Sequence, residues 1–323
     1  MTVATKIPAP RGEPAPLLSI PAAPVPAGGS AQWFIGSGGR RLRVAYFPAK
    51  KPVGSVLLST GRTETIEKYL EVVGELLERG YSVLVHDWRG QGLSDRLLPD
   101  RLRGHAVGFN DFVADFESLV GAFDDQLPHP RIAMAHSMGG CLVMLALAHG
   151  ERRFEGAILS SPMLGVRTGA PPYWLARAMT WVMSKAGLGG GYVLFNATDP
   201  YTATFEGDRM THDRARHDRS QAQILASRDL ALGNVTWSWA SSAFDAVEWL
   251  QRAPAVAQIT IPVTLVAAGQ DTLVDSAAAK AIAGRLPHGR FVEIPGAYHE
   301  ILMETDDIRA VFWAEFDALA RAL

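Results

Sequence analysis

Short apolar runs alternate with longer segments of helical periodicity along most of this chain. Strand-length runs occur at 56–59, 83–85, 131–136, 157–159, 263–267 and 291–294. Apolar residues recur at helical spacing over 66–79, 110–127, 276–286 and 306–323, and Asn110 is expected to cap the second of these helices. Repeated strand–helix units predict an α/β fold with a doubly wound, mostly parallel sheet.

The N-terminal part does not follow this alternation. Residues 32–36 and 42–47 flank a glycine-containing turn and predict a β-hairpin. Residues 1–30 are rich in proline and alanine without helical or strand periodicity, so we expect a disordered arm. Prolines interrupt every apolar stretch there, which argues against a secretory signal, and no segment is long and apolar enough to span a membrane. These features predict a cytoplasmic protein.

The alternation also stops over residues 162–244. This stretch holds an apolar segment that includes Trp174 and Met179, three consecutive glycines at 189–191 and a charged run at 208–219. We interpret it as a cap over the active site, inserted into a core of residues 31–161 and 245–323. The alternative is that its apolar side chains pack into the main domain. His212 and His217 would not share a helical face, so a solvated charged helix is expected there rather than a metal site.

Composition and charge narrow the class of protein. The chain has 323 residues, 48% of them hydrophobic and 20% charged, which suits one large domain with an insertion. The formal net charge of -2 provides no broad electrostatic attraction for nucleic acid. Cys141 is the only cysteine, so the sequence excludes a disulfide framework and a cysteine-based metal site.

Ser137 is the candidate nucleophile. It follows the apolar run 131–136 and precedes Gly139, Gly140 and an apolar helical stretch, which is the pattern of a sharp strand-to-helix turn that exposes a serine hydroxyl. The usual pattern is Gly-x-Ser-x-Gly, and Ala135 replaces its first glycine here. An ordinary turn would have the same local sequence, so the interpretation depends on finding a base and an acid further along the chain.

Both groups are present in the order that this fold requires. Asp271 directly follows the strand predicted at 263–267, and His299 follows the strand predicted at 291–294. Asp271 is expected to orient the His299 ring and to stabilise the imidazolium that forms during attack. Asp275 is the alternative acid, and either aspartate could instead cap the helix that begins near residue 276. His136 and His86 are weaker candidates for the base because neither lies in the required loop.

An oxyanion hole needs two backbone N–H groups, one after the nucleophile and one from the loop after an early strand. Met138 supplies the first. The second is expected from Arg62, because the preceding Gly61 lets the backbone turn toward the substrate. The Arg62 side chain could also bind a phosphate, although a surface arginine is the commoner case.

Several motifs resemble those of one enzyme family. The segment 87–94, Asp-Trp-Arg-Gly-Gln-Gly-Leu-Ser, is similar to a signature of α/β-hydrolases of the monoacylglycerol lipase and serine aminopeptidase type. The segments 61–64, 103–105, 109–113 and 296–302 are similar to the bacterial lysophospholipase branch of that family. The resemblance covers residues 40–160 and 255–323 and matches the cap only loosely. Besides Ala135, Thr60 departs from the family, because many relatives carry histidine before the oxyanion glycine.

The resemblance implies a serine carboxylester hydrolase acting on a lysophospholipid or a monoacylglycerol, with peripheral contact at the inner face of a membrane. The mechanism requires no metal or organic cofactor, and the expected partner is a small-molecule or lipid ester substrate rather than nucleic acid. In the cap, Trp174 and Met179 are candidate substrate contacts, together with Gly61. A short-chain esterase and a small-amide peptidase are alternatives with the same chemistry. An acyltransferase and a non-catalytic ligand-binding protein are further ones.

Overall fold

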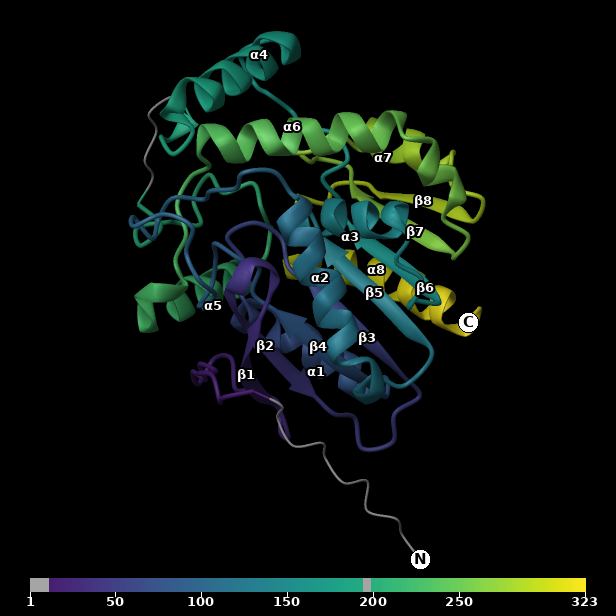
Figure 1. The fold of residues 1–323 in the computed structure, drawn as a ribbon. Helices are drawn as coiled ribbons and strands as arrows, with labels where there is room; N and C mark the ends of the chain where they lie inside the picture. The colour runs from purple at the N-terminus through teal and green to yellow at the C-terminus, as the bar shows by residue number, and fades with distance from the viewer. Residues whose placement is uncertain (1–11, 194–198) are drawn as a thin grey trace, which may run out of the picture.

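An eight-stranded sheet forms the centre of the protein in a computed structural model, which describes residues 12–193 and 199–323 (Figure 1). Its strand order is β1-β2-β4-β3-β5-β6-β7-β8. The strands are β1 (Ser30–Ile35), β2 (Arg41–Phe47), β3 (Gly54–Ser59), β4 (Tyr81–His86), β5 (Arg131–His136), β6 (Gly156–Ser160), β7 (Val263–Ala268) and β8 (Gly289–Ile294). β1 and β2 form the predicted antiparallel hairpin at one edge of the sheet. The other six strands, β3 to β8, are parallel to one another. The predicted α/β sheet is confirmed.

Helices cover both faces of the sheet (Figure 1). The helices α2 (Asn110–Ala122), α3 (Met138–His149), α6 (Trp237–Arg252) and α7 (Ser276–Ala283) share a buried cluster with strand residues such as Leu57 and Ala133. On the opposite face, α1 (Leu70–Glu78) and α8 (Asp306–Arg321) pack on alternate strand residues such as Leu58 and Ile132. Because both faces are covered, the inner strands are apolar throughout, which explains their continuous runs in the sequence.

The start of α2 differs from the prediction. Phe109 occupies the N-cap position and Asn110 is the first helical residue, and no side chain caps this end of the helix. Phe109 is held at the cap position because its ring is buried, where it lies edge-on to Phe112 with ring centroids 5.5 Å apart. The helix also ends earlier than predicted, since α2 stops at Ala122 and residues Asp124–Gln126 form a short 3-10 helix before Pro128.

The predicted disorder of residues 1–30 does not hold for residues 12–29, and residues 1–11 lie outside the described part. The Ala15 N–H donates to the Ala31 carbonyl at 2.9 Å, and the Trp33 N–H donates to the Glu13 carbonyl at 2.8 Å. The segment therefore lies along the outer edge of β1. Proline is compatible with such an edge, because one side of the backbone needs no donor.

Between β6 and β7 the chain forms α4 (Tyr173–Met183), α5 (Arg214–Ala226) and α6. α4 packs on α6, on the side away from the sheet (Figure 1). The cap was predicted to end at residue 244, but α6 continues without a break to Arg252, and its later residues Val247 and Leu250 are buried in the main core. The last part of the predicted cap therefore belongs to a helix that continues into the core. α6 packs on α4 of the insertion and also buries apolar residues in the main core.

A buried ion cluster joins β2 to the ends of β3 and β4. Arg43 is fully buried and donates to both carboxylate oxygens of Glu67 at 2.6 Å and to Asp87 at 2.8 Å. Asp87 also accepts the backbone N–H groups of Ile66 at 3.0 Å and Leu93 at 2.9 Å. The guanidinium therefore balances two carboxylates that have no access to water.

We expect Arg43→Met to destabilise the fold by about 3–5 kcal/mol, because it leaves two buried carboxylates without a cation. The loss can be measured by urea unfolding. Arg41→Met is the matched control on the same strand, since the Arg41 side chain is 52% exposed and its ion pair with Asp95 spans 3.9 Å. The control should cost less than about 1 kcal/mol. Equal losses for the two variants would contradict the assigned role of Arg43.

Candidate active site

Ser137 occupies a strained turn between β5 and α3. Its backbone has φ 50° and ψ -116°, a left-handed conformation that is unfavourable for a residue with a side chain. Two backbone hydrogen bonds hold it there: the Ser137 N–H donates to the Ser160 carbonyl at 3.0 Å, and the Met163 N–H donates to the Ser137 carbonyl at 2.9 Å. The turn leaves the Ser137 side chain partly accessible at the end of β5.

The two glycines after Ser137 are required by close packing. A Cβ atom at Gly139 would lie 2.5 Å from the Thr60 carbonyl oxygen, and one at Gly140 would lie 2.8 Å from Pro162 Cβ. Ala135, where the usual pattern has glycine, is fully buried in β5. The methyl group that Ala135 adds to the usual pattern is therefore packed in the core.

The three predicted triad residues lie together. His299 Nε2 is 2.9 Å from Ser137 Oγ, and His299 Nδ1 is 2.6 Å from Asp271 Oδ2. The other Asp271 oxygen accepts the backbone N–H groups of Leu273 at 2.8 Å and Val274 at 3.0 Å. With Nδ1–H donating to the carboxylate, Nε2 is the ring nitrogen that accepts the hydroxyl proton of Ser137.

The structure distinguishes the two candidate acids. Asp275 caps α7, where its side chain accepts the Ala277 N–H at 3.1 Å. Asp271 faces His299. Burial acts to raise the pKa of Asp271, but the hydrogen bond and charge of His299 and the two backbone N–H groups outweigh it and lower the pKa below its ordinary value. Asp271 therefore stays ionised beside the imidazole.

His136 and His86 have other partners. His136 Nδ1 lies 3.0 Å from Glu64 Oε2, and its Nε2 lies 3.2 Å from the backbone carbonyl of His299. Both partners are acceptors, so the geometry fits an imidazolium that donates from each nitrogen. Burial acts to lower the pKa of His136, but the charge of Glu64 outweighs it and raises the pKa. His86 is buried under the loop after β3, 3.2 Å from Ser59 Oγ, and burial lowers its pKa to about 3.

Glu64 is the residue of this site to which the sequence analysis assigned no role. It accepts the Gly61 N–H and, at 2.7 Å, the Tyr69 hydroxyl, and it pairs with Lys68 at 3.1 Å. Burial acts to raise the pKa of Glu64, but His136 and Lys68 outweigh it and hold the pKa well below its ordinary range. The available signal in the sequence was an acidic residue three positions after the loop glycine and two positions before the apolar Ile66.

Side chains of the 87–94 segment hold the predicted oxyanion loop, residues 59–62, through hydrogen bonds to its carbonyl groups. The Trp88 indole N–H donates to the Thr60 carbonyl at 2.8 Å, and the Gln91 amide donates to the Gly61 carbonyl at 2.7 Å. Gly61 itself is confined, because a Cβ atom there would lie 2.7 Å from both Glu64 Oε2 and His136 Nδ1. Gly61 therefore serves the packing of the loop, and its N–H is taken by Glu64. The N–H of the next residue, Arg62, is the candidate donor to the oxyanion.

Met138 is the first residue of α3, so its N–H has no carbonyl partner within the helix. Arg62 follows Gly61 in the loop after β3. Its guanidinium donates to the Gly233 carbonyl at 2.8 Å and lies over the Trp239 ring, 5.7 Å from the ring centroid. Arg62 thus connects the loop after β3 with the segment that leads into α6.

An apolar cavity of about 230 Å³ lies between α4, α6 and residues 166–168. Met179 lines it, as do Trp239 and Ala240. The predicted substrate contact of Trp174 is not supported: its side chain is 70% exposed on α4 and is not part of the lining. Arg167, in the wall, donates to the carbonyls of Leu273 and Val274, so this wall contacts the loop that follows Asp271.

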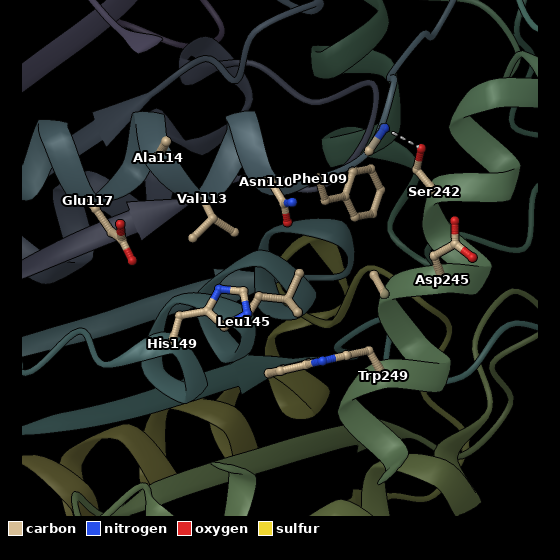
Figure 2. A pocket seen from close by; sticks show the side chains of 12 residues that line it. Phe109, Asn110, Val113, Ala114, Glu117, Leu145, His149, Ser242, Asp245 and Trp249 are labelled. Carbon is tan, nitrogen blue, oxygen red and sulfur yellow. Dashed lines mark hydrogen bonds between the residues drawn. The ribbon is translucent and has the colours of Figure 1, made fainter. Parts of the chain in front are cut away.

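A second cavity, of about 730 Å³, contains no triad residue. Figure 2 shows its walls: α2 contributes Val113, α3 contributes Leu145 and His149, and α6 contributes Asp245 and Trp249. It opens on the face of the sheet covered by these helices. Its volume therefore says nothing about the size of the substrate at Ser137.

His212 and His217 lie apart from the triad. His212 Nδ1 is 2.8 Å from a Glu304 oxygen, and its ring stacks on Tyr298 with centroids 3.8 Å apart. His217 faces the neighbouring carboxylate of Asp218 at 2.9 Å. Within residues 12–193 and 199–323, no three His, Cys, Asp or Glu side chains come together as a metal site.

A family model described as serine aminopeptidase, S33, matches residues 50–306. The chain belongs to this family. Its members are serine hydrolases, so the protein is an ester-hydrolysing enzyme of the α/β-hydrolase fold, and the resemblance predicted from its motifs is confirmed.

Relatives and solved structures agree with this assignment. Lysophospholipase L2 of Escherichia coli is 31% identical over 84% of this chain and 81% of its own length. Monoacylglycerol lipase of Mycolicibacterium smegmatis is 29% identical over 84% of this chain and 91% of its own. A crystal structure of a soluble variant of Saccharomyces cerevisiae monoglyceride lipase has a TM-score of 0.70 at 20% identity, covering 89% of this chain and 94% of that one. This last likeness shows the fold.

We expect Asp271→Asn to lower kcat by about 10³- to 10⁴-fold, because an amide no longer holds the His299 ring in the tautomer that accepts the serine proton. Asp275→Asn is the matched control, since asparagine also caps helices and should leave kcat within about twofold of the wild type. Kinetics on one chromogenic ester measure both. A large loss in the control, with little loss in Asp271→Asn, would identify Asp275 as the acid instead.

The His136–Glu64 pair predicts a pH dependence of stability. Since folding raises the pKa of His136, the stability from its protonated form is complete below about pH 6.5 and is lost as the pH rises through the folded pKa. The lowered pKa of Glu64 keeps its carboxylate charged on the acid side. The advantage of the wild type over His136→Gln in unfolding free energy should therefore shrink as the pH rises above about 6.5.

Urea unfolding at several pH values measures this difference. His129→Gln is the control, because His129 pairs with Glu155 at the surface, where its side chain is 60% exposed. The control should show little change across the same range. An advantage that stays constant or grows with pH for His136→Gln would rule out the buried imidazolium.

Proposed function

We propose that this enzyme hydrolyses carboxylic esters through an acyl-enzyme on Ser137. The observation that carries the proposal is the hydrogen-bonded chain from Asp271 through His299 to Ser137, at 2.6 and 2.9 Å. His299 Nε2 takes the hydroxyl proton as Ser137 Oγ bonds to the ester carbonyl carbon, and the oxyanion binds the N–H groups of Met138 and Arg62.

Collapse of this intermediate breaks the bond to the alcohol oxygen. His299 gives the proton to the departing alkoxide, which leaves as the alcohol. A water molecule then loses a proton to His299 and attacks the acyl-enzyme. The acid is released as the proton returns to Ser137 Oγ, so the enzyme ends in its starting state.

We propose a single-chain lipid ester, a lysophospholipid or a monoacylglycerol, as the substrate class. Relatives named lysophospholipase L2 and monoacylglycerol lipase support it. The apolar cavity supports it physically, because a site lined by Met179, Trp239 and Phe244 removes an acyl chain from water. Because its wall at Arg167 contacts the loop after Asp271, we place the acyl chain in the cavity while its ester is at Ser137.

Wild-type enzyme should hydrolyse lauroyl lysophosphatidylcholine or lauroylglycerol with a higher kcat/KM than p-nitrophenyl acetate, and a fluorophosphonate probe should label Ser137. Ala240→Phe places a ring in the cavity. It should lower kcat/KM for the long-chain ester by about tenfold relative to the acetate, because the loss of contacts to about two methylene groups of the acyl chain changes the free energy by this amount. Mass spectrometry locates the label.

Ala222→Phe is the matched control, since Ala222 is exposed on α5 and should leave the chain-length preference unchanged. A preference for the acetate in the wild type would favour the short-chain esterase. Hydrolysis of small amides in preference to esters would favour the peptidase. Transfer of the acyl group to an added alcohol in preference to water would favour the acyltransferase, and folded protein without a Ser137 adduct would overturn the serine mechanism altogether.

We also propose peripheral contact with a membrane through the outer face of α4, on the cytoplasmic side expected from the sequence. Trp174, Trp181 and Val182 are 70%, 50% and 52% exposed, and Thr180 is the one residue of α4 that is buried. No helix of the described segments is long and apolar enough to cross a membrane. Exposed tryptophans on a short helix suit the lipid–water interface.

Replacing Trp174 and Trp181 together by glutamine should lower the fraction of enzyme that sediments with phospholipid vesicles, because each tryptophan contributes apolar area to the interface. Trp249→Gln is the control: Trp249 is 38% exposed on α6, beside the cavity of Figure 2. Unchanged sedimentation of the double variant would contradict the proposed contact through α4.

A further inference from the structure

The Arg62 side chain is half-buried in the loop after β3, with little to compensate its charge. Among residues 12–193 and 199–323, the guanidinium makes one hydrogen bond, to the Gly233 carbonyl, and its Cζ lies 5.7 Å from the centroid of the Trp239 ring. Within the described residues no carboxylate pairs with it. Burial lowers its pKa to about 10, which is the direction expected of a cation removed from water without a counter-ion.

Three other buried or half-buried arginines differ from Arg62. Arg43 binds the carboxylates of Glu67 and Asp87, and Arg89 binds both oxygens of Asp115. Arg96 has no carboxylate partner among the residues that the structure describes, but it donates to three backbone carbonyls, those of residues 101, 229 and 231. A guanidinium has five N–H donors, so Arg62, with one acceptor, has spare donors for a ligand.

The place of Arg62 identifies the part of a substrate that its side chain can reach. Its backbone N–H is a proposed donor to the ester oxyanion, and its guanidinium is one side-chain length away. In a lysophospholipid, three glycerol carbons and two ester oxygens separate the acyl carbonyl carbon from phosphorus, a span similar to that of an arginine side chain. Trp239, under the guanidinium, also lines the apolar cavity. Ester, acyl chain and phosphate can therefore be bound together.

We propose that the Arg62 side chain binds the phosphate of a lysophospholipid, so that the enzyme prefers this substrate over a monoacylglycerol with the same acyl chain. The inference rests on the proposed hydrolysis of single-chain lipid esters. A phosphate accepts charge-assisted, bidentate hydrogen bonds from a guanidinium and supplies the missing counter-charge. The hydroxyl groups of a monoacylglycerol supply no charge.

The test compares lauroyl lysophosphatidylcholine with lauroylglycerol. In Arg62→Gln, kcat/KM should fall for both, but by at least about tenfold more for the lysophospholipid, since a hydrogen bond to a charged group contributes enough to change binding by this factor. The amide of glutamine can still donate to the Gly233 carbonyl. Arg62→Lys should recover part of the preference, because it restores the charge without the planar fork.

Arg103→Gln is the matched control. Arg103 also donates to a carbonyl of the inserted segment, that of Gly190 at 3.0 Å, but it pairs with Asp100 and is 38% exposed. Its substitution should leave the substrate ratio unchanged. Thermal unfolding of each variant establishes that it is folded, and Arg62→Lys serves as the test variant if Arg62→Gln is not.

Four outcomes would count against the proposal. A parallel loss of both activities in Arg62→Gln and Arg62→Lys would show that Arg62 only ties the loop after β3 to Gly233. Inhibition of lauroylglycerol hydrolysis by inorganic phosphate, with an unchanged substrate ratio in the variants, would show a free-anion site unrelated to the lipid. Wild-type enzyme that hydrolyses neither lipid would overturn the proposed function itself, whereas equal use of both lipids would overturn only the role of Arg62.

Discussion

The left-handed backbone at Ser137 is the constraint on which the rest of the site depends. Such a conformation costs about 1–3 kcal/mol in a residue with a side chain and persists only when its surroundings hold it. Here the Ser160 carbonyl, the Met163 N–H and the close approach of Gly139 to the loop after β3 all hold it. The carboxyl ends of β3, β5 and β6 lie side by side. The oxyanion loop, the nucleophile and the start of the inserted segment are therefore close together.

Behind this turn, the site is supported by buried charge rather than by apolar packing alone. His136 connects the carbonyl of His299 with Glu64, and Glu64 in turn binds the Gly61 N–H. One ion pair therefore links the histidine loop to the oxyanion loop across the nucleophile. Its charges are costly to bury singly, so the pair favours the one arrangement in which both loops are in place.

Chemistry and substrate selection are assigned to different parts of the chain. The sheet and its loops carry Ser137, Asp271 and His299, whereas the inserted segment forms most of the apolar cavity and the exposed face of α4. Arg62 belongs to both parts, because its backbone lies in the loop after β3 and its side chain reaches Gly233 of the insertion. With the acyl chain in this cavity, as proposed, a substitution in the insertion is expected to alter the substrate preference without disturbing the hydrogen bonds of the triad.

The sequence by itself predicted the α/β sheet, the nucleophile Ser137, the base His299 and two candidate acids between them, because alternating strands and helices bring the carboxyl ends of parallel strands to one edge. Only the tertiary structure decided between Asp271 and Asp275, paired Glu64 with His136, ordered residues 12–29 along β1 and turned Trp174 outward. Each of these depends on which distant group occupies the adjacent space. Local patterns in a sequence describe the strands and helices, whereas the partner of a buried charge is set by how they pack.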